Sequence, residues 1–201
     1  MVAALKDGKG NAIKGAMITV KLAGLSRTLI TDSDGQVSLS TDNIVPDSYI
    51  ADISFSGDRK HYASSTTAKV TVNKVRTSLT ADDVVTVYND GKSLTATLKD
   101  GDGKAISKVD VTVKLGDVVK TLTTDSKGSV SLSTDGLVPD VYMANIDFAG
   151  NNIYYASATT ARVTVNKVST SLSAPDVNCD YDSGKDIVAT LIDQRGNAVK
   201  G

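Results

Sequence analysis

The stretch VDVTVKLGDVVKTLTT, residues 109–124, decides the fold class of this sequence. Apolar and polar side chains alternate along Val109–Leu115, which is the pattern of a β-strand with one buried face. The pair Gly116-Asp117 is a turn signal, and Val118–Thr123 is long enough for one more short strand. The same period of two recurs on both sides of this stretch, at residues 94–98, 130–132, 142–148 and 161–165.

Two further segments and the composition complete the prediction of an all-β fold. TSLT (77–80) and VVTVY (84–88) raise the expected number to about seven or eight short strands within one stretch of the chain. All 23 acidic residues are Asp, which favours turns, while Val and Thr favour strands, so we expect almost no helix. Many short strands with regular turns are typical of a two-sheet sandwich, so we expect tandem immunoglobulin-like β-sandwich domains.

The phrase LKDGDGKAISK, residues 98–108, occurs three times in related form. The copies begin at residues 5, 98 and 191, a spacing of 93 residues each time, so the sequence is a tandem array. We expect residues 1–75 to be an immunoglobulin-like repeat that lacks its first strands. Residues 76–168 form the complete repeat, and residues 169–201 are the opening strands of a third. The simplest account of the partial copies is a section of a longer array.

Charge and composition exclude several classes of partner. The formal net charge is −1 with dispersed signs, so there is no basic stripe for nucleic acid. No apolar run approaches the roughly 20 residues that cross a bilayer. The single cysteine, Cys179, matches Thr86 in the previous copy and excludes an internal disulfide framework. We therefore expect no nucleic-acid partner, no membrane span in this stretch and no cofactor.

A calcium loop is the first chemistry that the sequence suggests. DGDGK, residues 100–104, places carboxylates at alternate positions, as ligands of a hard cation are spaced. However, its third position, Asp102, is Lys9 in the first copy and Arg195 in the third. A positive charge at a ligand position opposes cation binding, so we interpret the segment as an Asp-Gly turn and expect no metal site.

Catalysis finds little support in the sequence. The only histidine, His61, corresponds to Tyr154 one repeat later, and no serine or cysteine can be paired with a recurring base. We therefore expect a protein that is not an enzyme, with no catalytic residues.

An aromatic platform is what a sandwich usually needs to bind carbohydrate. The sequence has no Trp, and most Tyr and Phe residues fall on strand positions that face the core. Tyr154 and Tyr155, beside the turn GNN, are the only aromatic pair that we expect to be exposed. They are the candidate contacts for a glycan or protein ligand.

Three segments carry a resemblance to a known family. TTDSKGSVSLSTDGLVP from Thr123, YMANIDFAGNNIYYAS from Tyr142 and VTVNKVSTSLSAPDV from Val163 resemble the immunoglobulin-like repeats of methanogen cell-surface adhesin-like proteins. Bacterial immunoglobulin-like adhesin repeats are more distant relatives. The resemblance implies an extracellular, cell-surface location and a role as stalk or spacer units in cell adhesion. The alternative is a module whose loops bind a glycan or protein ligand directly.

Some adhesin modules that this unit resembles contain a covalent Lys–Asn amide crosslink. The resemblance makes Lys99 with Asn166, and Lys6 with Asn73, the candidate pairs. The third copy has Ile192 at the lysine position, and the chain has no Glu to shuttle the proton. We therefore expect no crosslink.

The partial copies at the two ends complement each other. The first repeat lacks the opening strands that the last residues of the chain contain, so the tail of one molecule could add to the open edge of the next near residues 70–75. We expect a stiff connection between neighbouring repeats and, through such strand addition, head-to-tail self-association into a filament. The segment expected to dock runs from Ser169 to Ala189, and its apolar residues include Leu172, Val177, Ile187 and Ala189.

Overall fold

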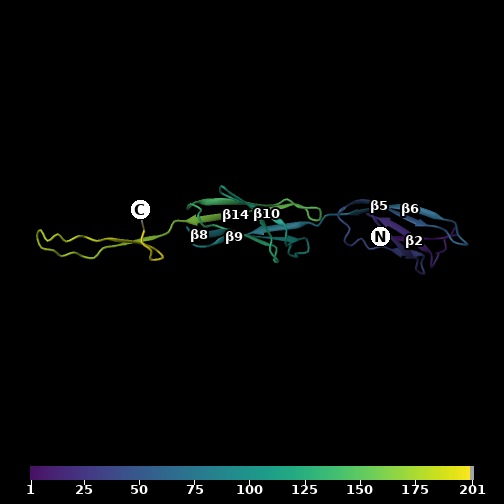
Figure 1. Cartoon of the computed structure of the whole chain (residues 1–201), viewed down its shortest axis with the longest axis horizontal. Helices are drawn as coiled ribbons and strands as arrows, with labels where there is room; N and C mark the ends of the chain where they lie inside the picture. The colour runs from purple at the N-terminus through teal and green to yellow at the C-terminus, as the bar shows by residue number, and fades with distance from the viewer. Residues whose placement is uncertain (200–201) are drawn as a thin grey trace. The chain divides into compact units, whose positions relative to one another are not determined.

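A computed structural model describes residues 1–199 of the chain, so the last two residues of the expected third repeat lie outside the described part. Within residues 1–199 all regular structure is β-strand, as the sequence predicts (Figure 1). No helix in this range is long and apolar enough to cross a membrane. The chain divides into two compact units, Met1–Arg76 with Gly150–Tyr155, and Thr77–Ala149 with the residues from Ala156 onward.

We call β7–β14 sandwich 2. One sheet has five strands in the order β11-β10-β13-β14-β8, and the other has three in the order β12-β9-β7. All pairs are antiparallel except β8, which runs parallel to β14. The strands span Thr77–Ala81 (β7), Val84–Val87 (β8), Ser93–Asp100 (β9), Asp110–Leu115 (β10), Val118–Thr123 (β11), Ser129–Ser133 (β12), Val141–Phe148 (β13) and Ser157–Asn166 (β14).

The core of sandwich 2 confirms the alternating pattern read from the sequence. In β9, β10, β13 and β14 every second residue is buried or half-buried, and most of the residues between them are exposed. Because the two inner faces meet, their apolar side chains exclude water, which is the main stabilising contribution to such a fold. The largest fully buried side chains of this unit are Leu94, Leu98, Leu115, Ile146, Val111 and Val163.

We call β1–β6 sandwich 1. Its larger sheet has the order β3-β2-β5-β6, and β1 pairs with β4 in the second sheet. Each strand matches one of sandwich 2 at a spacing of 93 residues, but in the described chain no strand of sandwich 1 takes the positions of β7 and β8. The strands span Val2–Ala4 (β1), Met17–Leu22 (β2), Leu25–Ile30 (β3), Gln36–Ser38 (β4), Asp47–Phe55 (β5) and Ser64–Val72 (β6).

The terminal strand pair consists of β15 (Thr170–Ser173) and β16 (Thr190–Asp193). They pair antiparallel, with Thr170 opposite Asp193 and Leu172 opposite Leu191. This register repeats that of β7 on β9, where Thr77 is opposite Asp100 and Leu79 is opposite Leu98. Within residues 1–199, the third copy therefore has two strands, paired as their counterparts in sandwich 2 are.

Tyr142 and its counterpart Tyr49 lie at equivalent places in the two sandwiches. Both rings are half-buried, and each hydroxyl donates to a carbonyl four residues earlier, of Val138 and Val45, at 2.7 Å. This is the tyrosine corner of immunoglobulin-like sandwiches, in which the ring anchors the loop that precedes its strand.

Candidate functional site

The most distinctive surface feature is a groove along the side of sandwich 1 that lacks two strands. We call it the open groove. Its volume is about 410 Å³, and β1, β2, β5 and β6 contribute its walls. Its apolar lining includes Ala3, Leu5, Ile18, Ile53, Phe55 and Ala68.

In sandwich 2 the same place is filled by β7. Leu79 of β7 is only 6% exposed, and the residues equivalent to the groove lining are closed over. Leu98, Ala96 and Ala161 are at most 2% exposed there, whereas their counterparts Leu5, Ala3 and Ala68 are half-buried. The open groove therefore corresponds to the position that β7 occupies in sandwich 2, and no strand of residues 1–199 lies in it. We call this position the seat.

A second open position lies along β6, which is the edge strand of its sheet. In sandwich 2 the equivalent strand, β14, is covered by β8, with Val84 opposite Val163 and Val87 opposite Asn166. The N–H of Tyr88 extends this pairing by donating to the Asn166 carbonyl at 2.9 Å. An uncovered edge presents backbone donors and acceptors to which another strand can pair.

The end of β8 is fastened by a polar contact between Thr86 and Asp90. Thr86 is 2% exposed, and its hydroxyl donates to the Asp90 carboxylate, which also accepts the N–H groups of Val87 (3.1 Å) and Lys92 (3.0 Å). These bonds, the Thr86 hydroxyl foremost, lower the pKa of Asp90 from 3.8 to about 2. The charged carboxylate is therefore the form that holds the strand end.

Acid should weaken this fastening. Because the pKa of Asp90 is lower in the folded state, its contribution is complete above pH 3.8 and is lost as the pH falls through about 2. We expect Asp90→Asn to destabilise sandwich 2 at pH 5 and to make less difference at pH 2. Denaturant midpoints at both pH values measure this, and Thr86→Val, which removes the main donor, should reproduce the effect. Titration of the Asp90 carboxyl near pH 4 in the folded protein would contradict it.

The segment predicted to dock on a neighbour is largely exposed. Leu172 is 71% and Ile187 78% exposed, Ser169 and Ala189 also face solvent, and Val177 is half-buried. Within the described chain, the regular structure of this segment is confined to the terminal strand pair. Large apolar side chains exposed on an unaccompanied strand pair are typical of surfaces that another molecule covers.

The expectation about exposed aromatic residues is wrong in part. Tyr155 is 48% exposed, but Tyr154 is half-buried, because its segment pairs with the chain at Val75. The most exposed rings are Tyr62, at 98%, and Tyr181, at 102%. Tyr62 occupies the position of Tyr155 one repeat earlier, so the repeat spacing itself was the signal that could have found it.

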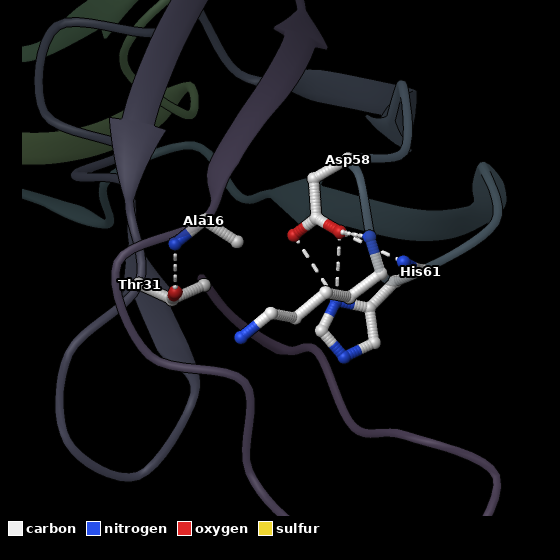
Figure 2. A network of polar contacts seen from close by, with 5 residues as sticks. Ala16, Thr31, Asp58 and His61 are labelled. Atoms are coloured by element: carbon white, nitrogen blue, oxygen red, sulfur yellow. Dashed lines mark hydrogen bonds and ion pairs between the residues drawn. The ribbon is translucent and has the colours of Figure 1, made fainter.

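His61 lies in the loop between β5 and β6 beside Asp58 (Figure 2). Its Nδ1 is 3.0 Å from both carboxylate oxygens, and the Asp58 carboxylate also accepts the N–H groups of Lys60 and His61. The contact with the imidazole lowers the pKa of Asp58. One repeat later, the side-chain oxygen of Asn151 accepts the equivalent N–H groups, so the Asp58 carboxylate closes its loop as an uncharged amide does.

The carboxylates of DGDGK and of DSKGS, residues 125–129, close turns. In DGDGK, Oδ1 of Asp100 accepts the N–H groups of Asp102 (3.1 Å) and Lys104 (2.8 Å). Asp125 does the same with Lys127 and Ser129, and these bonds, that of Ser129 first, lower its pKa. Among the described residues, no cluster of three or more acidic, His or Cys side chains forms a metal-binding group.

The candidate crosslink pairs are not brought together. Lys99 is on β9 and Asn166 is on β14, which belong to different sheets, and both side chains are exposed. Each follows a buried residue on its strand, so both point away from the core and from each other. Lys6 and Asn73, one repeat earlier, are likewise exposed.

Comparisons with known proteins bear on the fold. No model of a known protein family matches the sequence, and no curated protein matches it. Over 100% of its length the chain is similar to the crystal structure of invasin, a bacterial integrin-binding protein, with a TM-score of 0.53, 14% identity and coverage of 44% of that chain.

Two further solved structures are less similar. One belongs to a 1.5-MDa bacterial ice-binding adhesin (TM-score 0.39, 13% identity, 82% of this chain and 59% of that chain). The other contains fibronectin(III)-like modules of Clostridium thermocellum CbhA (TM-score 0.36, 12% identity, 83% and 84%). The chain thus spans less than two thirds of invasin and of the ice-binding adhesin. Together with the sheet order, the likeness to invasin shows an all-β protein of immunoglobulin-like β-sandwich domains.

Proposed function

We propose that this chain is a structural spacer of an extracellular, cell-surface adhesin-like protein, with neighbouring repeats of the same protein as its first partners. Its units are residues 1–75, 76–168 and 169–201, and chains of this kind extend head to tail by strand addition. The observation that carries the spacer role is the parallel pairing of β8 with β14.

This pairing suits a domain that bears tension. A pull on the complete repeat enters through β7 and β8 at its start and leaves through β14 at its end. Because β8 and β14 are parallel, the two forces act in opposite directions along the strands, and the hydrogen bonds between them are loaded together rather than one after another. A spacer between a cell and a distant binding partner needs this resistance.

The surface location is supported by what the chain is similar to. Invasin is a bacterial integrin-binding protein, and the second structure is from an ice-binding adhesin. The resemblance of the three sequence segments to methanogen adhesin-like repeats points the same way. The proposal is for a non-enzymatic protein, because no serine or cysteine of the sequence can be paired with a base that recurs in both copies.

Single-molecule force spectroscopy on the whole chain tests the spacer role. Unfolding should release an extended chain of about 300 Å from sandwich 2 and about 240 Å from sandwich 1, at about 3.4 Å per residue, so the gain in each step is this length minus that of the folded domain. We expect the longer step at the higher force, because only sandwich 2 has the β8–β14 pairing within the described chain. Equal forces for the two steps would contradict the proposal.

A matched pair of variants isolates the hydrogen bonds. Tyr88→Pro removes the N–H that donates to the Asn166 carbonyl and should lower the force of the longer step. Tyr88→Ala keeps that N–H and serves as the control, since it changes the side chain alone. If both variants unfold at the same force, the parallel pairing does not bear the load.

Direct ligand binding is the second candidate function. It is favoured by the recurrence of an exposed tyrosine at the same place in both repeats, Tyr62 and Tyr155. Exposed aromatic rings at loops are frequent contacts for glycans and proteins. Binding of the chain to cells or a glycan array, lost in Tyr62→Ala with Tyr155→Ala while the fold is retained, would favour this role over the spacer.

A further inference from the structure

We propose that Thr170–Asp180 of one chain docks on sandwich 1 of a second copy, in the place that Thr77–Val87 takes in sandwich 2. β15 enters the open groove, and the residues that follow it pair with the edge of β6. The inference rests on the proposed strand addition between chains and names the donor segment and its seat.

The residues that line the open groove resemble those that surround β7 in sandwich 2. Five of its apolar residues are of the same type as their counterparts in sandwich 2, which pack around β7. The matching pairs are Ala3 and Ala96, Leu5 and Leu98, Ile53 and Ile146, Phe55 and Phe148, and Ala68 and Ala161. A segment with the side chains of β7 therefore fits this groove as β7 fits its own.

β15 is such a segment. Its first three residues, Thr170, Ser171 and Leu172, repeat Thr77, Ser78 and Leu79 of β7. Leu79 is 6% exposed in its seat, whereas Leu172 is 71% exposed beside β16, so docking would bury an apolar side chain that is now in water. On docking, β15 would leave β16 and pair with β1 of the second copy. β1 is the equivalent of β9, with which β7 pairs in sandwich 2.

One polar contact also has its counterpart. The hydroxyl of Thr77 donates to Oγ of Ser157 on β14 at 2.8 Å. The equivalent residues are Thr170 in the donor and Ser64 on β6, which lines the groove. The docked strand would therefore keep its hydroxyl paired as it enters the seat.

The second half of the donor matches β8. Val177 and Cys179 are the equivalents of Val84 and Thr86, and the β8 register places Cys179 opposite Val72 of β6. Cys179 is exposed in the chain, while Thr86 is 2% exposed, so docking would bury the thiol. Ile187 and Ala189 lie outside the donor, because their equivalent positions in sandwich 1 are already held by Met1 and Ala3.

Residues 1–199 contain one open groove and one donor segment, so the proposed contact is heterologous, and a dimer would leave one groove and one donor unpaired. A second chain that fills the seat of the first leaves its own seat open to a third. Such a contact propagates into an open chain of molecules rather than a closed ring unless the rotation closes.

Association of the full chain is the first test. Sedimentation or light scattering over a range of concentrations should show a mass that grows beyond a dimer. Leu172→Asp should leave a monomer, and Leu172→Ala should weaken association by about tenfold or more. The matched control is Ile187→Asp, which changes an equally exposed apolar residue outside the donor and should associate as the unmodified chain does.

Cysteine chemistry tests the register. On mild oxidation, Val72→Cys should form disulfides with the natural Cys179 of other chains and give a ladder of linked chains. The control is Ile30→Cys, which places a thiol on exposed β3 away from the open groove and should form such linked chains more slowly. In the unmodified chain, thiol labelling of Cys179 should slow as the protein concentration rises. The second measurement needs no substitution and so is independent of any effect of the variants on folding.

The outcomes separate the two levels of the proposal. A strict monomer at every concentration would overturn both the docking and strand addition. Association that survives Leu172→Asp, or equal ladders from Val72→Cys and Ile30→Cys, would overturn the assignment of donor and seat while strand addition stands. The spacer role is judged by the unfolding forces alone, whichever of these results is found.

Discussion

Replacing Gly128 with alanine is expected to destabilise sandwich 2 by about 3–5 kcal/mol, enough to unfold a domain of ordinary stability. Gly128 has φ +75°, and an added Cβ would lie 2.4 Å from the Leu98 carbonyl oxygen and 3.1 Å from the Ile106 nitrogen. The Gly128 carbonyl also accepts the Leu98 N–H at 2.8 Å, so the two segments cannot separate without losing that bond.

The control for this change is Gly103→Ala. Gly103 has a similar φ of +82°, but no atom lies within 4 Å of the position of its Cβ. Its cost should therefore be that of the left-handed backbone alone, about 1–2 kcal/mol. Hydrogen exchange read by mass spectrometry measures the two sandwiches separately in the whole chain. Equal costs at Gly128 and Gly103 would show that the close approach to Leu98 is not rigid.

The sequence could predict the strands because alternation is a local property. Val109–Leu115 and residues 142–148 each show their period of two without reference to any partner, and the repeat spacing then transfers the assignment to the first copy. The Asp-Gly turns could be predicted equally well, because the hydrogen bonds that form them join Asp100 or Asp125 to N–H groups at most four residues away.

The parts of the site that depend on pairing could not be read in the same way. Nothing in VVTVY indicates that β8 runs parallel to β14, because that pairing joins residues 79 positions apart, as Val84 and Val163 are. The same holds for the half-burial of Tyr154, which follows from its pairing with Val75. The sequence led to a prediction of docking near residues 70–75, at the β6 edge. It could not predict the open groove, because the groove is formed by strands of both sheets.

Leucine-to-alanine substitutions at the same position of the two repeats should have unequal effects. Leu98 is fully buried beside Leu79, which lies opposite it on β7, so Leu98→Ala should cost about 3–4 kcal/mol, the usual loss for a buried leucine. Leu5 is its equivalent but lines the open groove and is half-buried. Leu5→Ala should therefore cost only about 1–2 kcal/mol in a dilute sample, because less apolar surface is returned to water.

The comparison needs a position that is equally buried in both repeats, and Leu22 with Leu115 is such a pair, at 2% and 1% exposure. Leu22→Ala and Leu115→Ala should cost the same, so that a difference between Leu5 and Leu98 reflects the missing strand rather than the lower stability of one sandwich. If a donor strand fills the groove, the cost of Leu5→Ala should rise toward that of Leu98→Ala as the protein is concentrated. A cost that is already equal in dilute solution would mean that the groove is closed without a second chain.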